Sequence, residues 1–220
     1  RQMCIRDRCK DVDPSAIMQA EQELLREGTS IEELQRLCDV HSALFHGSAT
    51  DAQKLHSKDI QDQRLSAAAA LIQISGHPLQ TFTLENAALE KLIARAKQVL
   101  ENGTIDDGSL NELRQIAIHY AKKGDLLYPH LKVQYGISGP SAVMWTVDDE
   151  IRDELNALAK QKDQKETDAW KQRLNAVLTR MEEMIYKESN ILFPNCALNF
   201  SEEEWYHIYR DAKDYAECFG

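Results

Sequence analysis

The sequence predicts an all-α protein, built as an up-down-up-down four-helix bundle with an N-terminal helical hairpin and a C-terminal extra helix. Glycine and proline are scarce, at 9 and 5 of 220 residues, and apolar residues recur mostly at helical spacing. Four long amphipathic segments also follow one another with only short loops between them. Short loops make consecutive helices antiparallel neighbours, which is the arrangement of such a bundle.

The N-terminal part is predicted to form two short helices. Residues 1–10 carry alternating charge without periodicity, and we expect a non-native or disordered remnant there. Residues 11–56 form the predicted helical hairpin. Its first helix has Asp13 as N-cap, and its second begins with a capping box in which Glu33 follows Ser30 by three residues.

A polar and then alanine-rich connecting segment, with a helix of its own, is expected at 57–76. The bundle itself is predicted at 77–198. Its four amphipathic segments have the following ranges: 79–102, 107–135, 139–161 and 165–197. A last helix is expected within 199–220, where Ser201 and Glu204 make a second capping box, and we expect a further domain to follow it.

One phrase occurs twice in the bundle. "GDLLYPHL" at 124–131 returns as "SNILFPNC" at 189–196, so that the segment 119–129 aligns with 184–194 without a gap. In the predicted bundle the second and fourth helices run in the same direction and lie diagonally across the core. His119 and Glu188 should then face a common centre, where a ligand could bind on a pseudo-twofold axis. The alternative is that these phrases only fill the core and end a helix.

Charge and cysteine content narrow the classes of partner. The chain has 36 acidic and 26 basic side chains, a net charge of -10, which argues against general affinity for nucleic acid or an anionic membrane. The five cysteines include no C-x-x-C pair, and they indicate reduced thiols in a cytoplasmic protein. No apolar run approaches the length of a membrane span, about 18 residues.

The order and spacing of the bundle phrases resemble the hemerythrin-like HHE cation-binding family. That family has a His, an acidic pair four and five residues later, and an apolar phrase ending in Pro ten residues from the His. The intervals 119–129 and 184–194 match this spacing, and Asp148 aligns in sequence with the His of the family's third helix. The N-terminal part is similar to a helical domain of unknown function that precedes such modules in chains often ending in a PAS domain.

The resemblance implies a cation site, but this sequence has lost much of the ligand pattern. Lys123 stands where the family has an acidic residue, and a cation there opposes a dication if it points inward. Residues 77–197 contain only three histidines, so a five-His di-iron site and oxygen carriage are disfavoured. The metal-ligand candidates that remain are His77, Glu85, His119, Asp148 and Glu188. They suit iron or another divalent metal, such as manganese or zinc.

Three alternatives to a metal centre stay open at this point. His119 could be a buried histidine that hydrogen-bonds to Asp148 or Glu188 without metal. Haem could bind between Met184 and either His77 or His119. The single Glu-x-x-His pair, Glu204 and His207, lies outside the bundle and is expected to be solvated.

These observations give two leading hypotheses of function. The first is a sensory or regulatory module with a reduced, mononuclear metal site, which acts on a partner protein or an adjacent sensory domain. The second is a metal-free helical module for protein interaction. An enzyme is disfavoured, because the sequence has no Ser/His/Asp order, phosphate loop or reactive Cys motif.

Overall fold

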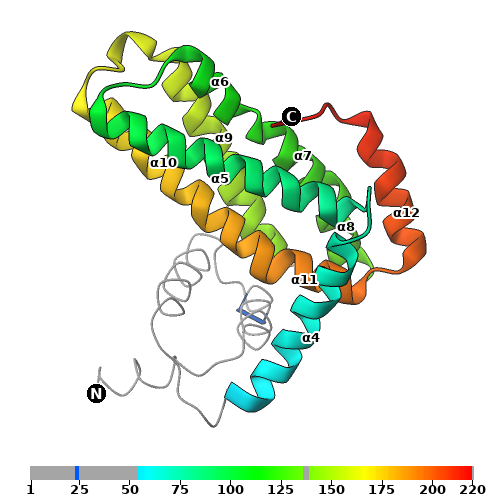
Figure 1. Ribbon diagram of the computed structural model, residues 1–220. Coiled ribbons are helices and arrows are strands. Elements are labelled where there is room, and N and C mark those ends of the chain that lie inside the picture. The colour runs from blue at the N-terminus through cyan, green and yellow to red at the C-terminus, as the bar shows by residue number, and fades with distance from the viewer. Residues whose placement is uncertain (1–22, 25–53, 136–138, 220) are drawn as a thin grey trace.

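The computed structural model describes residues 23–24, 54–135 and 139–219, and within these ranges every regular element is a helix. Figure 1 shows long helices aligned side by side, with the C-terminal elements packed across one end. The predicted remnant at 1–10 lies outside the described residues, as does most of the predicted hairpin at 11–56. In the described part of the chain no helix is long and apolar enough to cross a membrane.

The first helix of the bundle begins where the sequence places it. Before it, α4 (Lys54–Ile72) packs against α5 and α11. α5 (Pro78–Asn102) starts with His77 as N-cap, whose Nδ1 accepts a hydrogen bond from the Leu79 N–H at 3.1 Å. Pro78 occupies the first helical position, where its missing N–H costs nothing.

The second bundle helix is divided into three parts. These are α6 (Asp107–Arg114), α7 (Ile116–Leu126) and α8 (Tyr128–Val133). Pro129 lies in the first turn of α8, where its missing N–H is tolerated, and the chain continues as a helix beyond it.

The third and fourth bundle helices complete the core. α9 (Gly139–Lys160) is followed by the short turn η2 (Lys162–Gln164) and then by α10 (Asp168–Lys187). α10 passes through a π-helical turn, η3 (Glu188–Leu192), into α11 (Phe193–Asn199). Pro194 lies just after the π-helical turn. A proline has no N–H to donate to the helical hydrogen-bond pattern, and the wider turn fits this interruption.

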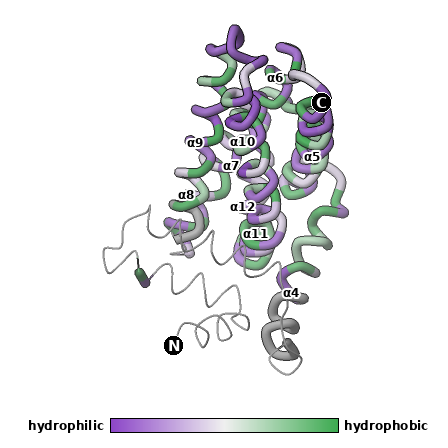
Figure 2. Tube along the Cα trace, turned by 90° about the vertical axis from the view of Figure 1, so that its left-hand side faces the viewer, coloured by the Kyte–Doolittle hydropathy of each residue, from purple (hydrophilic) through white to green (hydrophobic). Residues whose placement is uncertain are grey.

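The packing of these helices confirms the predicted bundle. α10 packs against α5 and α9, and α6 and α7 pack against the same two helices. The second and fourth helices therefore lie diagonally across the core, as the repeated phrase predicts. Apolar residues alternate with polar ones along each helix (Figure 2), and most of the buried apolar residues form one cluster.

The C-terminal elements cover one side of the bundle. α12 (Glu202–Asp211) begins with the predicted capping box, in which Ser201 and Glu204 exchange side-chain and backbone hydrogen bonds. α12 packs against α5 and is followed by η4 (Ala212–Asp214). The chain then runs along α7, where the Tyr215 hydroxyl donates to Asp125 Oδ2 at 2.7 Å.

A candidate ion-pair centre in the bundle

His119 lies at the middle of the bundle with no exposed surface. Its Nδ1 is 2.7 Å from Glu85 Oε2 on α5, and its Nε2 is 3.1 Å from Glu188 Oε2 in the π-helical turn. Burial lowers the pKa of His119, but the charge and hydrogen bonds of Glu188 and Glu85 outweigh burial and leave the pKa raised. With a carboxylate at each ring nitrogen, the doubly protonated imidazolium is the favoured form.

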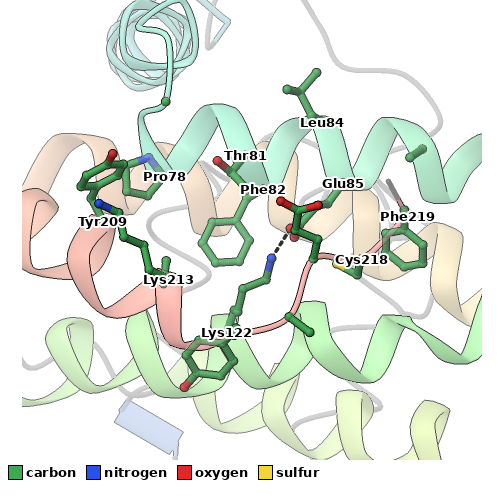
Figure 3. A pocket seen from close by; sticks show the side chains of 16 residues that line it. Pro78, Thr81, Phe82, Leu84, Glu85, Lys122, Tyr209, Lys213, Cys218 and Phe219 are labelled. Carbon is green, nitrogen blue, oxygen red and sulfur yellow. Dashed lines mark hydrogen bonds and ion pairs between the residues drawn. The ribbon is translucent and has the colours of Figure 1, made fainter.

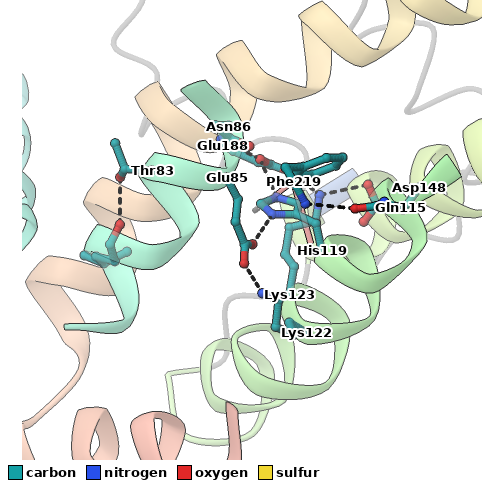
Figure 4. Close-up of polar contacts among 11 residues, drawn as sticks. Thr83, Glu85, Asn86, Gln115, His119, Lys122, Lys123, Asp148, Glu188 and Phe219 are labelled. Carbon is teal, nitrogen blue, oxygen red and sulfur yellow. Dashed lines mark hydrogen bonds and ion pairs between the residues drawn. The ribbon is translucent and has the colours of Figure 1, made fainter. Parts of the chain in front are cut away.

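Lys123 lies one turn further along α7 and is also fully buried. Its Nζ donates to Asp148 Oδ1 at 2.8 Å and to Glu188 Oε1. The ammonium also lies 4.3 Å from the centre of the Tyr120 ring, at cation–π distance. The lysine therefore points into the bundle, to the place where carboxylates from two other helices converge (Figure 4).

The two carboxylates that share Lys123 differ in their protonation. Burial acts to raise the pKa of Glu188, but Lys123 and His119 outweigh it and lower the pKa to about 2. Asn86 adds a hydrogen bond from Nδ2 to Glu188 Oε2 at 2.8 Å. Asp148 accepts one hydrogen bond from Lys123 and one from the Tyr128 hydroxyl, the latter at 3.1 Å. These contacts do not offset burial, which raises the pKa of Asp148 to about 7.

A third carboxylate extends the cluster toward the surface. Glu85 accepts from His119 with Oε2 and from Lys122 Nζ with Oε1, so both of its oxygens are engaged. Burial acts to raise the pKa of Glu85, but these two partners lower it. With His119 protonated and all three carboxylates ionised, the cluster holds equal numbers of positive and negative groups: His119, Lys122 and Lys123 against Glu85, Asp148 and Glu188. We call these six residues the charge cluster.

Four of the five residues predicted as metal ligands meet in the charge cluster. The structure brings together Glu85, His119, Asp148 and Glu188 from four different bundle elements. His77 is not among them. It caps α5 eight residues before Glu85, about 12 Å along the helix axis, and its ring lies 4.7 Å from that of Trp205.

The donor set of this centre does not fit the dinuclear metal site implied by the family resemblance. The single imidazole in the cluster has both nitrogens engaged by carboxylates, and the Lys123 ammonium lies where Asp148 and Glu188 converge. A dication beside this ammonium would be repelled. Within the ranges that the structure describes, no group of three or more His, Cys, Asp or Glu side chains is arranged to hold a metal ion.

The haem alternative finds no support in the same geometry. An axial histidine needs a free ring nitrogen, and neither nitrogen of His119 is free. His77 caps α5 through Nδ1 and packs its ring against that of Trp205, with ring centroids 4.7 Å apart. Met184 is buried within the apolar core cluster, as expected for a residue that fills space.

Sequence reasoning missed three contributors to the cluster: the pairing role of Lys122, the inward ammonium of Lys123, and the Tyr128 hydroxyl. The sequence does contain a feature that points to the lysines: Lys122 and Lys123 are adjacent in a mostly apolar segment that also contains His119. Helical spacing places residue 123 one turn from His119 and therefore on the same face.

The fold and the centre define an all-α bundle of four helices around buried charged groups. Comparison with known families agrees with this description: residues 77–196 match the hemerythrin HHE cation binding domain, and residues 3–51 match a family of unknown function, DUF438. The first match spans more than half of the 220-residue chain, so the chain belongs to the hemerythrin HHE family. No curated protein matches the chain.

Proposed function

We propose that this chain is a non-enzymatic regulatory module, in which the Lys123 ammonium takes the place of a metal ion and the bundle acts on a protein partner or a neighbouring domain. The observation that carries the proposal is the position of Lys123, fully buried between Asp148 and Glu188. The family is a cation-binding one, and the cation here is supplied by the chain itself.

The chemistry of the described residues favours a regulatory role over catalysis. Cys196 is buried, and burial raises the pKa of its thiol well above the usual value, so the thiol is a poor nucleophile. His119 is held by two carboxylates and has no free nitrogen with which to accept a proton from a substrate. The charged groups of the cluster mainly stabilise one another.

The charge cluster is also suited to couple the helices. It joins α5 through Glu85, α7 through His119, α9 through Asp148 and the π-helical turn through Glu188. A buried ion-pair network is sensitive to the position of each member, because an unpaired buried charge is costly. A partner that displaces one bundle helix would therefore change the energy of the whole cluster.

Metal analysis tests the proposal. The wild-type chain, purified anaerobically and incubated with Fe(II), Mn(II) or Zn(II), should retain only substoichiometric metal after desalting. Lys123→Glu removes the ammonium and adds a carboxylate among Asp148, Glu188 and His119, so this variant should bind more metal than the wild type. Stoichiometric metal in the wild type would overturn the proposal.

A second candidate is a metal sensor in which a divalent ion displaces the Lys123 ammonium. It is favoured by the presence of one imidazole and three carboxylates in the charge cluster, residue types that can ligate iron, manganese or zinc once the Lys123 ammonium has left the centre. This candidate predicts saturable binding of Mn(II) in calorimetry, with release of protons. Asp148→Asn should weaken that binding, whereas Glu182→Gln, at a partly exposed surface pair with Lys97, should leave it unchanged.

A further inference from the structure

A cavity of about 590 Å³ lies beside the charge cluster, between α5, α7 and the C-terminal residues. This volume is within the range of small-molecule sites, about 300–1,000 Å³. Aromatic side chains from separate parts of the chain line it: Phe82, Tyr209, Tyr215 and Phe219. Figure 3 shows Phe82 and Lys122 near the middle of the cavity, with Tyr209 and Lys213 toward one end and Phe219 toward the other.

The C-terminal strap, residues 215–219, forms one wall of this cavity and is held at both ends. The Tyr215 hydroxyl donates to Asp125 Oδ2 at 2.7 Å, and the Phe219 N–H donates to Gln115 Oε1 at 2.9 Å. Between these anchors Cys218 is buried against the bundle. The cavity is therefore bounded on one side by the bundle and on another by the C-terminal strap, which two hydrogen bonds hold in place.

Two ammonium groups, Lys122 and Lys213, line the cavity together with two carboxylates, Glu85 and Glu217. Lys213 lies over the Tyr209 ring at 4.2 Å and, within the described residues, has no carboxylate at ion-pair distance. Lys122 has Glu85 as its partner, but Glu85 also carries the hydrogen bond of His119. Lys213 and Glu217 are both exposed at the mouth of the cavity, and no ion pair joins them within the described residues.

From this geometry we propose that the cavity binds a small aromatic carboxylate. Its ring would lie among Phe82, Tyr209 and Phe219, and its carboxylate would accept hydrogen bonds from Lys213 and Lys122. Charge-assisted hydrogen bonds of this kind are among the stronger polar contacts in proteins. The inference is independent of whether Lys123 excludes metal from the centre, because Lys123 does not line the cavity.

A ligand bound in the cavity could affect the charge cluster through Lys122, which belongs to both. A carboxylate bound to Lys122 competes with Glu85 for the same ammonium. Glu85 in turn holds Nδ1 of His119, whose Nε2 faces Glu188. Occupation of the cavity should therefore alter the electrostatic balance of His119.

Calorimetric titration with 2-naphthoate tests this inference, with 2-naphthalenemethanol as an uncharged compound of the same ring. We expect saturable binding of 2-naphthoate by the wild-type chain and much weaker binding of the alcohol. Lys213→Met should weaken 2-naphthoate about tenfold, the effect of losing one charge-assisted contact. Lys91→Met, at an exposed lysine of α5 that does not line the cavity, should have no effect.

Several outcomes would overturn the inference. These are no saturable binding of 2-naphthoate by the wild type, equal affinity for the alcohol, or an unchanged affinity in Lys213→Met. Because Lys213 is exposed, its substitution should leave the fold intact, which circular dichroism verifies. As a second variant, Tyr209→Ala removes one aromatic wall and should also weaken 2-naphthoate, whereas Tyr186→Ala, away from the cavity lining, should not.

Discussion

At the scale of single residues, Lys123 decides what the centre can be. The sequence predicts that His119, Asp148 and Glu188 converge, and the structure brings these three together with Glu85. The direction of the lysine could not be predicted, because a four-carbon side chain can reach either solvent or the core from the same helical position. The surrounding carboxylates, contributed by other helices, hold it inward.

Removal of the Lys123 charge should be strongly destabilising. Lys123→Met leaves Glu188 and Asp148 buried without their shared cation, a loss that typically costs about 3–5 kcal/mol. Urea unfolding measures this free energy. The control Lys97→Met removes the partly exposed pair with Glu182 and should cost less than about 1 kcal/mol. Equal losses in the two variants would contradict the role given to Lys123.

Asp148 should make stability depend on pH near neutrality. Its pKa is raised from 3.8 to about 7, so the folded protein holds this proton more tightly than the unfolded chain does. The contribution of this proton to the free energy of unfolding is fully present below pH 3.8, the ordinary pKa of the Asp148 carboxyl group in the unfolded chain. It is lost as the pH rises through about 7. The free energy of unfolding should therefore decrease between about pH 5 and pH 8.

The Asp148→Asn variant isolates this contribution. Its stability should vary less with pH than that of the wild type, although His119, whose pKa is also raised, still titrates in the same direction. Asp149→Asn, at the partly exposed neighbouring carboxylate that pairs with Arg152, should keep the wild-type slope. Parallel curves for wild type and Asp148→Asn, measured by urea unfolding across the pH series, would exclude a titrating Asp148.

At the scale of elements, the helix ranges were predictable and the breaks within helices were not. The predicted segments 79–102 and 139–161 agree closely with α5 and α9. The predicted segments 107–135 and 165–197 run past Pro129 and Pro194, and helix does continue beyond both prolines, but the breaks near Gln115 and Leu127 and the π-helical turn were not predicted. The π-helical turn before Pro194 contains Glu188, so the same irregularity that accommodates the proline also positions a central carboxylate.

The capping box of α12 gives a prediction for that helix. Ser201→Ala removes the side-chain acceptor at the N-cap and should cost about 1 kcal/mol. Hydrogen exchange should show faster amide exchange in α12, while α5 and α9 are unaffected. Ser66→Ala replaces an exposed serine inside α4, where alanine favours helix, and should cause no loss. Unchanged exchange in α12 would mean that packing alone holds this helix.

At the scale of the whole molecule, the bundle should be stable without metal. With all six groups ionised, the charge cluster balances its own charges across the four bundle helices, so we expect that no bound ion is needed to hold them together. A chelator such as EDTA should leave the thermal midpoint of unfolding unchanged. A bundle stabilised by metal would unfold at a lower temperature after chelation, because a ligand that binds only the folded state raises its stability.

The two family matches describe a chain with an N-terminal part of unknown function and a cation-binding bundle. The expected PAS domain and the sensory role stay predictions, because they come from resemblance and depend on partners. A sequence pattern predicts which faces of helices meet, but it does not identify what a surface binds. The aromatic cavity beneath the C-terminal strap likewise combines residues separated by more than 100 positions, from Phe82 to Phe219.

Anomalous X-ray diffraction from crystals grown with Mn(II) tests most directly whether Lys123 replaces the metal ion. We expect continuous density for the Lys123 side chain, with Nζ between Asp148 and Glu188, and no anomalous peak in the charge cluster. An anomalous peak within coordination distance of Glu188 and His119, with Lys123 turned away, would contradict it.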